Sequence, residues 1–161
     1  MIGPMALLSR QKGPIAVYGA TGYTGRLVAA ELADAGVAFV LAGRNREKLD
    51  ELASELKGDF EVRQAALADD ELRSLLGDCA AVIDCAGPFV EHGEPVLRAA
   101  VETETHYLDT TGEQPYMRMA FERYGPEAGC HWRLLHSTSS PERISSAERA
   151  VPWLGWKPRQ A

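Results

Sequence analysis

The sequence predicts a doubly wound α/β fold, in which a parallel sheet carries helices on both faces. Short apolar runs alternate along the chain with longer segments whose apolar residues recur at helical spacing, and glycine or proline separates the two. Strands that alternate with helices in this way form parallel sheets with helical crossovers. The chain has 161 residues, 45% of them hydrophobic and 25% charged, which fits one globular domain.

The first predicted strand leads directly into a glycine-rich turn and a helix. Residues 15–18 form an apolar run, glycines follow at positions 19, 22 and 25, and residues 26–35 have a helical pattern that Gly36 ends. In a dinucleotide-binding turn, the first glycine lets the chain leave the strand, the second lets a pyrophosphate approach the backbone, and the third lets the helix pack on the sheet. The helix N-terminus offers N–H groups and a positive dipole end. A Rossmann-type phosphate-binding turn through Gly25 is therefore predicted; a glycine-rich loop without a ligand is the alternative.

The end of the second predicted strand indicates which dinucleotide the domain binds. This strand covers residues 38–42 and is followed by Gly43, Arg44, Asn45 and Arg46. An NAD site usually has Asp or Glu here to hold the ribose 2′-hydroxyl, whereas a guanidinium suits the 2′-phosphate of NADP. We favour NADP over NAD, with Arg44 as the main phosphate ligand, Asn45 as a helper and Arg46 as a weaker candidate. The alternative is that both arginines lie on a solvated loop.

The remaining elements continue the alternation. We expect strands over residues 60–63, 80–86 and 106–109, and helices over residues 47–56, 69–76, 93–102 and 115–124. Pro95 is expected in the first turn of its helix, where its missing N–H costs nothing. The predicted strand order is 3-2-1-4-5, with residues 132–136 as a candidate sixth strand and the ligand across the carboxyl ends of the strands.

Composition excludes several classes of partner. The net charge of −6 argues against nucleic acid or an anionic membrane as a partner, and no apolar run is long enough to span a bilayer. Residues 1–12 lack the charge order of a secretory signal and are expected to be a flexible leader. Cys79, Cys85 and Cys130 are an odd number at no metal-binding spacing, which favours a reduced, cytoplasmic protein.

Five segments together carry a family resemblance: residues 19–25, 42–45, 87–89, 93–100 and 106–113. In order and spacing, over residues 14–129, they resemble the N-terminal half of saccharopine dehydrogenase-like oxidoreductases, a group that includes trans-acting enoyl reductases of lipid biosynthesis. The resemblance implies a second, substrate-binding domain and an adenosine 2′-phosphate on Arg44. It further implies that the pyrophosphate lies along Gly19, Thr21, Gly22, Tyr23 and Thr24, and the nicotinamide ribose beside Ala86, Gly87 and Pro88.

Two departures from the family pattern stand out. Family members commonly have an Asp near the adenine after the third strand, where this chain has Ala66, with Asp69 and Asp70 displaced by a few residues. After Gly129 the composition shifts to Ser, Pro and Arg, and all three tryptophans lie beyond residue 130. We therefore expect an NAD(P)-binding domain over residues 13–130, truncated before the second domain, and a loose tail over residues 131–161.

Other chemistry has weaker support. His92 and His106 are placed near the cofactor loops, where they could relay a proton or cap a loop. Asp84 and Asp109 end strands and either hold loop N–H groups or face the cleft. No Tyr-x-x-x-Lys and no Gly-x-Ser-x-Gly occurs, and His131 and His136 have no companion residues at metal-binding spacing.

The leading functional prediction is the NADP-binding domain of a hydride-transferring oxidoreductase that is inactive as this short chain, with no assigned catalytic residue. An NADP-binding sensor or regulatory module is the alternative from another class, and a fragment without a ligand is the third. The open cleft would leave apolar surface for a second copy or a partner domain to cover.

Overall fold

The computed structural model describes residues 13–131 and 134–136; the predicted leader and residues 137–161 of the predicted tail lie outside the described residues. The strands are β1 (Ile15–Tyr18), β2 (Phe39–Gly43), β3 (Phe60–Gln64), β4 (Ala81–Asp84), β5 (His106–Asp109) and β6 (Leu134–His136). The helices are α1 (Tyr23–Asp34), α2 (Arg46–Glu55), α3 (Asp69–Leu76), α4 (Phe89–Glu102) and α5 (Gln114–His131). No helix among these residues is apolar and long enough to cross a membrane.

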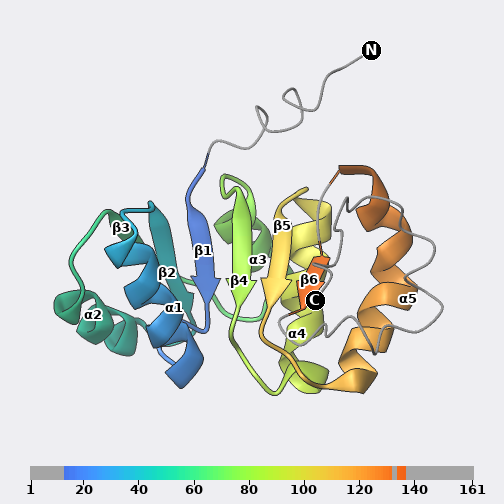
Figure 1. Ribbon diagram of the computed structural model, residues 1–161, viewed down its shortest axis with the longest axis horizontal. Coiled ribbons are helices and arrows are strands. Elements are labelled where there is room, and N and C mark those ends of the chain that lie inside the picture. Colours follow the sequence, from blue (N-terminus) through green and yellow to red (C-terminus); the bar gives the residue numbers. More distant parts are fainter. Residues whose placement is uncertain (1–12, 132–133, 137–161) are drawn as a thin grey trace, which may run out of the picture.

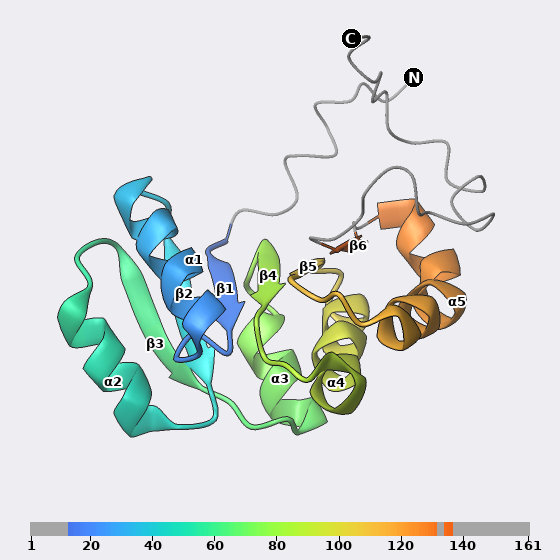
Figure 2. The same cartoon turned by 60° about the horizontal axis from the view of Figure 1, so that its bottom comes forward.

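The strands form one parallel sheet in the order β3-β2-β1-β4-β5-β6 (Figure 1). The predicted order is thus confirmed, and the candidate sixth strand is present as β6 beside β5. The chain order reverses at β1, which has β2 on one side and β4 on the other. In doubly wound sheets, ligands bind at the carboxyl ends of the strands beside such a switch point. Figure 2 brings this edge of the sheet forward.

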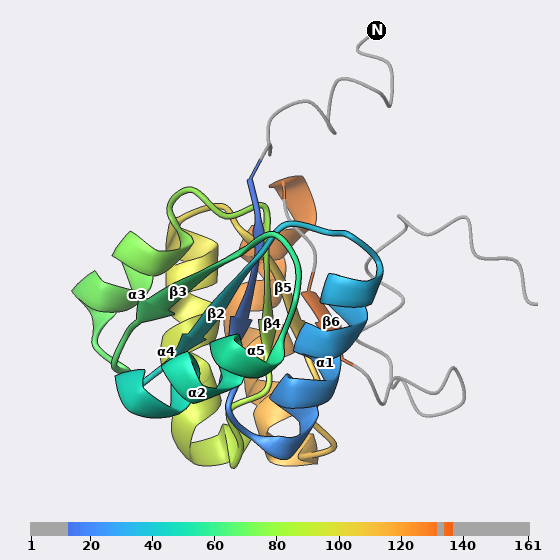
Figure 3. The ribbon, with the colours of Figure 1, turned by 90° about the vertical axis from the view of Figure 1, so that its left-hand side faces the viewer.

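Helices cover both faces of the sheet, as Figure 3 shows. Alternating residues of β1 and β2 supply the two apolar cores, because successive strand side chains point to opposite faces. Ala16 and Tyr18 pack with residues of α3, α4 and α5. Val17 and Leu41 pack in the other core, with residues of α1 and α2.

Three predicted helix boundaries are wrong by three residues or more. Helix α1 begins at Tyr23 instead of Arg26, within the glycine-rich turn. Helix α4 begins at Phe89 instead of Gly93, so Pro95 lies inside the helix and not in its first turn. The early start has a remote cause, because the carboxylate of Glu113 accepts hydrogen bonds from two N–H groups of the first turn. Helix α5 does not end at Tyr124 but continues through Gly125 and Pro126 to residue 131. Gly125, Pro126 and Gly129 in this extension are poor helix formers, which is why the local pattern predicted an earlier end.

A buried hydrogen-bond network joins the last residue of β4 and the second residue of β5 to α5. Asp84 has no exposed surface, and its Oδ2 accepts a hydrogen bond of 3.2 Å from the Tyr107 hydroxyl. The hydroxyls of Tyr107 and Tyr116 lie 2.8 Å apart. Asp84 Oδ1 accepts from the Ala86 N–H at 2.9 Å, so the network fixes the first residues of the loop that follows β4. Tyr116 in turn lies against Gly93, where a Cβ would come within 2.7 Å of its ring.

Burial governs the protonation of this network. Removal from water raises the pKa of Asp84 to about 8; the negative charge of Asp109 acts in the same direction, and hydrogen bonds from Ala86 and Tyr107 act in the opposite one. Asp84 and Asp109 both hold N–H groups of the loops that follow their strands, those of Ala86 and Thr111. This is the first of the two roles that the sequence left open for them.

Asp84 is expected to make folding pH-dependent. The folded chain keeps the Asp84 proton up to a pKa of about 8, whereas the unfolded chain loses it near 3.8. The folded state therefore binds more protons between these values, and this residue lowers the free energy of unfolding as pH rises, by at most about 1.4 kcal/mol per pH unit. Asp84→Asn is neutral and keeps an acceptor for Ala86, so urea unfolding of this variant should depend less steeply on pH than that of the unsubstituted chain.

The control for this experiment is Asp59→Asn, at an exposed aspartate outside the network. It should leave the pH dependence of unfolding unchanged. Parallel pH profiles for Asp84→Asn and the unsubstituted chain would contradict the assignment.

Candidate functional site

Two of the three glycines in the turn after β1 are required by close packing. Gly19 has a φ of +75°, and a Cβ there would lie 2.9 Å from the Ala86 nitrogen. A Cβ on Gly25 would lie 2.3 Å from the Gly19 carbonyl oxygen and 2.7 Å from the Ala20 Cα. A side chain at either position would push α1 or the β4 loop away from the turn.

Gly22 differs, because the protein itself leaves room for a Cβ there. Its φ of −75° suits any residue, and the nearest atom to a Cβ would be the Gly19 oxygen at 3.4 Å. Its N–H donates to that same oxygen at 3.0 Å, which closes the turn. Gly22 is exposed. The space beside its backbone therefore suits a ligand, and a bound pyrophosphate fits the residues present.

The N-terminus of α1 has no capping group of its own. No side chain caps it, and its first turn has no acidic residue. By contrast, Asn45 Oδ1 accepts from the Lys48 N–H at the start of α2, and Glu113 caps α4. Unsatisfied N–H groups and the positive end of the helix dipole favour an anion at α1. Tyr23 and Thr24, both predicted pyrophosphate residues, are exposed in this first turn.

A residue that the sequence analysis did not assign holds the turn in place. Arg26 donates from Nε to the Thr21 carbonyl at 3.4 Å and pairs with Glu55 of α2 at 3.0 Å. No local sequence pattern indicates this role, because Glu55 lies one crossover away along the chain.

The end of β2 carries the three residues predicted for the 2′-phosphate. Arg44 is exposed, and its carbonyl accepts from Gln64 at 3.0 Å. Arg46 instead forms a two-oxygen ion pair with Asp50, at 2.9 Å to each carboxylate oxygen. The Arg46 side chain is therefore already paired with Asp50. The side-chain oxygen of Asn45 already accepts the hydrogen bond from the Lys48 N–H. Arg44 is thus the most available of the three for a phosphate.

The segment predicted to lie beside the nicotinamide ribose does lie beside the turn. Ala86 contacts Gly19 across the switch point, and Gly87 and Pro88, joined by a cis peptide bond, are exposed next to it. The structure thus brings the residues predicted for the pyrophosphate and for the nicotinamide ribose together at one edge of the sheet.

The two histidines are not equivalent. His106 is the first residue of β5, and its N–H donates to the Ala80 carbonyl. It therefore lies at the amino end of the sheet, and its predicted place near the cofactor loops is wrong. His92 lies half-buried in the first turn of α4, at the carboxyl edge.

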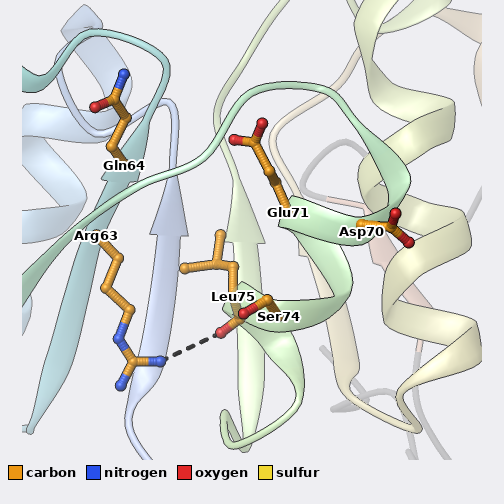
Figure 4. A pocket seen from close by; sticks show the side chains of 6 residues that line it. All are labelled: Arg63, Gln64, Asp70, Glu71, Ser74 and Leu75. Carbon is orange, nitrogen blue, oxygen red and sulfur yellow. Dashed lines mark hydrogen bonds between the residues drawn. The ribbon is translucent and has the colours of Figure 1, made fainter.

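The loop after β3 also differs from the family pattern. The Ala66 N–H donates to the Glu71 carboxylate at 2.7 Å, while Asp69 pairs with Arg98 and Asp70 with Arg73. A surface cavity beside this loop, between β3 and α3, is shown in Figure 4; it is lined by Arg63, Gln64, Asp70, Glu71, Ser74 and Leu75. Its arginine is already bound to Glu61, Asp78 and the Leu75 carbonyl.

The described residues contain no group of three or more His, Cys, Asp or Glu side chains suited to a metal ion.

Comparison with known sequences finds relatives among reductases. The chain is 34% identical over 120 residues to a putative trans-acting enoyl reductase of Mycobacterium tuberculosis, with 71% of this chain and 29% of that protein covered. It is 32% identical over 126 residues to a lipid droplet localized protein of Caenorhabditis elegans, covering 71% of this chain and 30% of that one. The chain thus spans less than a third of the length of these relatives.

Solved structures share the fold. Saccharopine dehydrogenase of Saccharomyces cerevisiae superposes with a TM-score of 0.60 at 18% identity, over 79% of this chain and 27% of that one. Triphenylmethane reductase of Citrobacter sp., solved with NADP(H), gives 0.51 at 27% identity, over 60% and 36%. The family model described as the saccharopine dehydrogenase NADP binding domain matches residues 15–147. With this match and the glycine turn at the switch point, the chain belongs to the saccharopine dehydrogenase NADP-binding domain family.

Proposed function

We propose that the turn from Gly19 to Gly25 and the N-terminus of α1 hold the pyrophosphate of NADP(H). The observation that carries this proposal is Gly22, a glycine that neither its φ nor its neighbours require. In the same pose, Arg44 meets the adenosine 2′-phosphate, with Asn45 beside it, and residues 86–88 lie beside the nicotinamide ribose.

In this role the domain provides the cofactor half of an oxidoreductase site. Bound NADPH would supply a hydride, and the protein would position it. Hydride transfer also requires a substrate held beside the nicotinamide. The described residues at this edge of the sheet include the turn, the loop of residues 86–88 and the exposed Arg44, which suit the nucleotide, and the half-buried His92 in the first turn of α4. We therefore propose that these residues bind NADP(H) without reducing a substrate by themselves.

Arg44→Ala should discriminate between the two dinucleotides. A hydrogen bond to a charged group contributes roughly 1.5–3 kcal/mol, so the variant should bind NADPH about 10- to 100-fold more weakly and NADH almost unchanged. Fluorescence titration with both cofactors measures this, with Arg46→Ala as the matched control because its guanidinium is already paired with Asp50. Equal losses for NADPH and NADH would refute the assignment of Arg44.

Gly22→Val tests the pyrophosphate position. A Cβ at Gly22 would be in ordinary van der Waals contact with the fold, so far-UV circular dichroism should stay near that of the unsubstituted chain, whereas calorimetry should detect neither NADPH nor NADH binding. Gly125→Val introduces the same side chain in α5, where a Cβ would meet nothing within 4 Å, and should bind both cofactors normally. Ordinary affinity of Gly22→Val for NADPH would place the phosphates elsewhere.

The 161-residue chain is expected to bind NADPH saturably without oxidising it in the presence of enoyl, carbonyl or saccharopine-type substrates. Positioning of two reactants can account for about 7–11 kcal/mol of a reaction barrier, and the proposed site positions only one of them. Absorbance at the reduced nicotinamide band follows the reaction. Steady oxidation that Gly22→Val abolishes would overturn this part of the proposal, whereas saturable binding without turnover is also what a sensor would show.

A further inference from the structure

Two carboxylates hold the segment from Ala86 to Val90, which joins β4 to α4. The Ala86 N–H donates a hydrogen bond to Asp84 Oδ1, at the end of β4. Glu113 reaches across from the loop after β5, with Oε1 accepting from the Phe89 N–H at 2.8 Å and Oε2 from the Val90 N–H at 2.9 Å. Both oxygens of Glu113 are therefore used on backbone groups 24 and 23 residues away along the chain.

Glu113 is itself held in place by the loop that carries it. Its N–H donates to the Thr111 hydroxyl at 3.0 Å, and the Thr111 N–H donates to Asp109 at 3.1 Å. Thr111 and Asp109 are buried, at 1% and 3% exposure. Two hydrogen bonds of ordinary length thus connect the Glu113 backbone, through Thr111, to Asp109 at the end of β5.

Glu113 and the two N–H groups that it holds, those of Phe89 and Val90, form a clamp on the start of α4. This clamp lies next to the proposed phosphate turn. Ala86, at one end of the held segment, contacts Gly19 of the phosphate turn. Gly87 and Pro88 lie between the two carboxylate-held points and are exposed. If Glu113 were removed, two N–H groups of α4 would lose their partner and the first turn would fray. A ligand that contacts Gly87 and Pro88 would then have to order this loop as it binds, which lowers affinity.

We propose that Glu113 is a positioning residue for the nicotinamide half of the cofactor. It acts through the backbone of Phe89 and Val90 and keeps the loop of residues 86–88 in its bound shape before the cofactor arrives. This inference rests on the proposed function, because it assigns those residues to the nicotinamide ribose. The adenosine half, at the end of β2, should not depend on it.

The experiment compares two probes by calorimetry: NADPH, and adenosine 2′,5′-bisphosphate, which has the 2′-phosphate but no nicotinamide. Loss of the clamp in Glu113→Ala should weaken NADPH binding by about tenfold, on the scale of one lost charge-assisted hydrogen bond. Binding of the bisphosphate should change by less than about twofold. Glu113→Gln keeps one acceptor oxygen and should lie between Glu113→Ala and the unsubstituted chain for NADPH. Glu122→Ala removes an exposed carboxylate of α5 and is the control for charge.

Each outcome has one meaning. Weaker NADPH binding with unchanged bisphosphate binding, together with partial rescue in Glu113→Gln, supports the inference. Unchanged binding of both probes by Glu113→Ala, or an equal loss for both, overturns it while NADP binding by the unsubstituted chain stands. Failure of the unsubstituted chain to bind either probe refutes the proposed function itself. If Glu113→Ala does not fold by circular dichroism, the same comparison with Glu113→Gln decides.

Discussion

The structure depends on a close approach of three backbones at the switch point. The end of β1, the start of α1 and the loop after β4 meet at Gly19 and Gly25, with distances that exclude even a methyl group. Glycine at both positions allows α1 to lie directly over the end of the strand and the β4 loop to lie against the turn. This arrangement aims the first turn of α1 at the carboxyl edge of the sheet, where a ligand can reach its N–H groups.

The helices of this domain differ in whether a side chain caps their N-terminus. α2 and α4 receive an oxygen from the protein itself, from Asn45 and Glu113, while α1 receives none. The helix dipoles at α2 and α4 are thus already compensated, and α3, which has no side-chain cap, has three acidic residues in its first turn. The first turn of α1, beside Gly22, has neither a side-chain cap nor an acidic residue. We infer that this distribution favours an anionic ligand at α1, although the turn itself contains no lysine or arginine. In the proposed pose, the exposed Arg44 at the end of the neighbouring strand would distinguish the dinucleotides.

Much of this arrangement was predictable from sequence, for definite reasons. Strand order follows from alternation and the handedness of crossovers, and the glycine spacing of the turn is local, so both could be predicted without knowledge of distant contacts. The start of α4 could not be predicted in this way, because its cap comes from Glu113, which lies 24 residues after Phe89. The network of Asp84 with Tyr107 and Tyr116 arises only when β4, β5 and α5 come together. The position predicted for His106 was wrong because this residue begins β5 and so lies at the edge of the sheet opposite the loop that follows the strand.

The central claim is that the pyrophosphate binds at the N-terminus of α1, and amide chemical shifts measured while NADPH is titrated into the ¹⁵N-labelled chain test it most directly. The account predicts the largest shifts for the amides of Gly22, Tyr23 and Thr24, with Ala86 next to them, and small shifts for Lys48, whose N–H already donates to Asn45. Shifts that centre instead on Gln64 and Glu71 at the cavity between β3 and α3, with Gly22 to Thr24 unmoved, would contradict it.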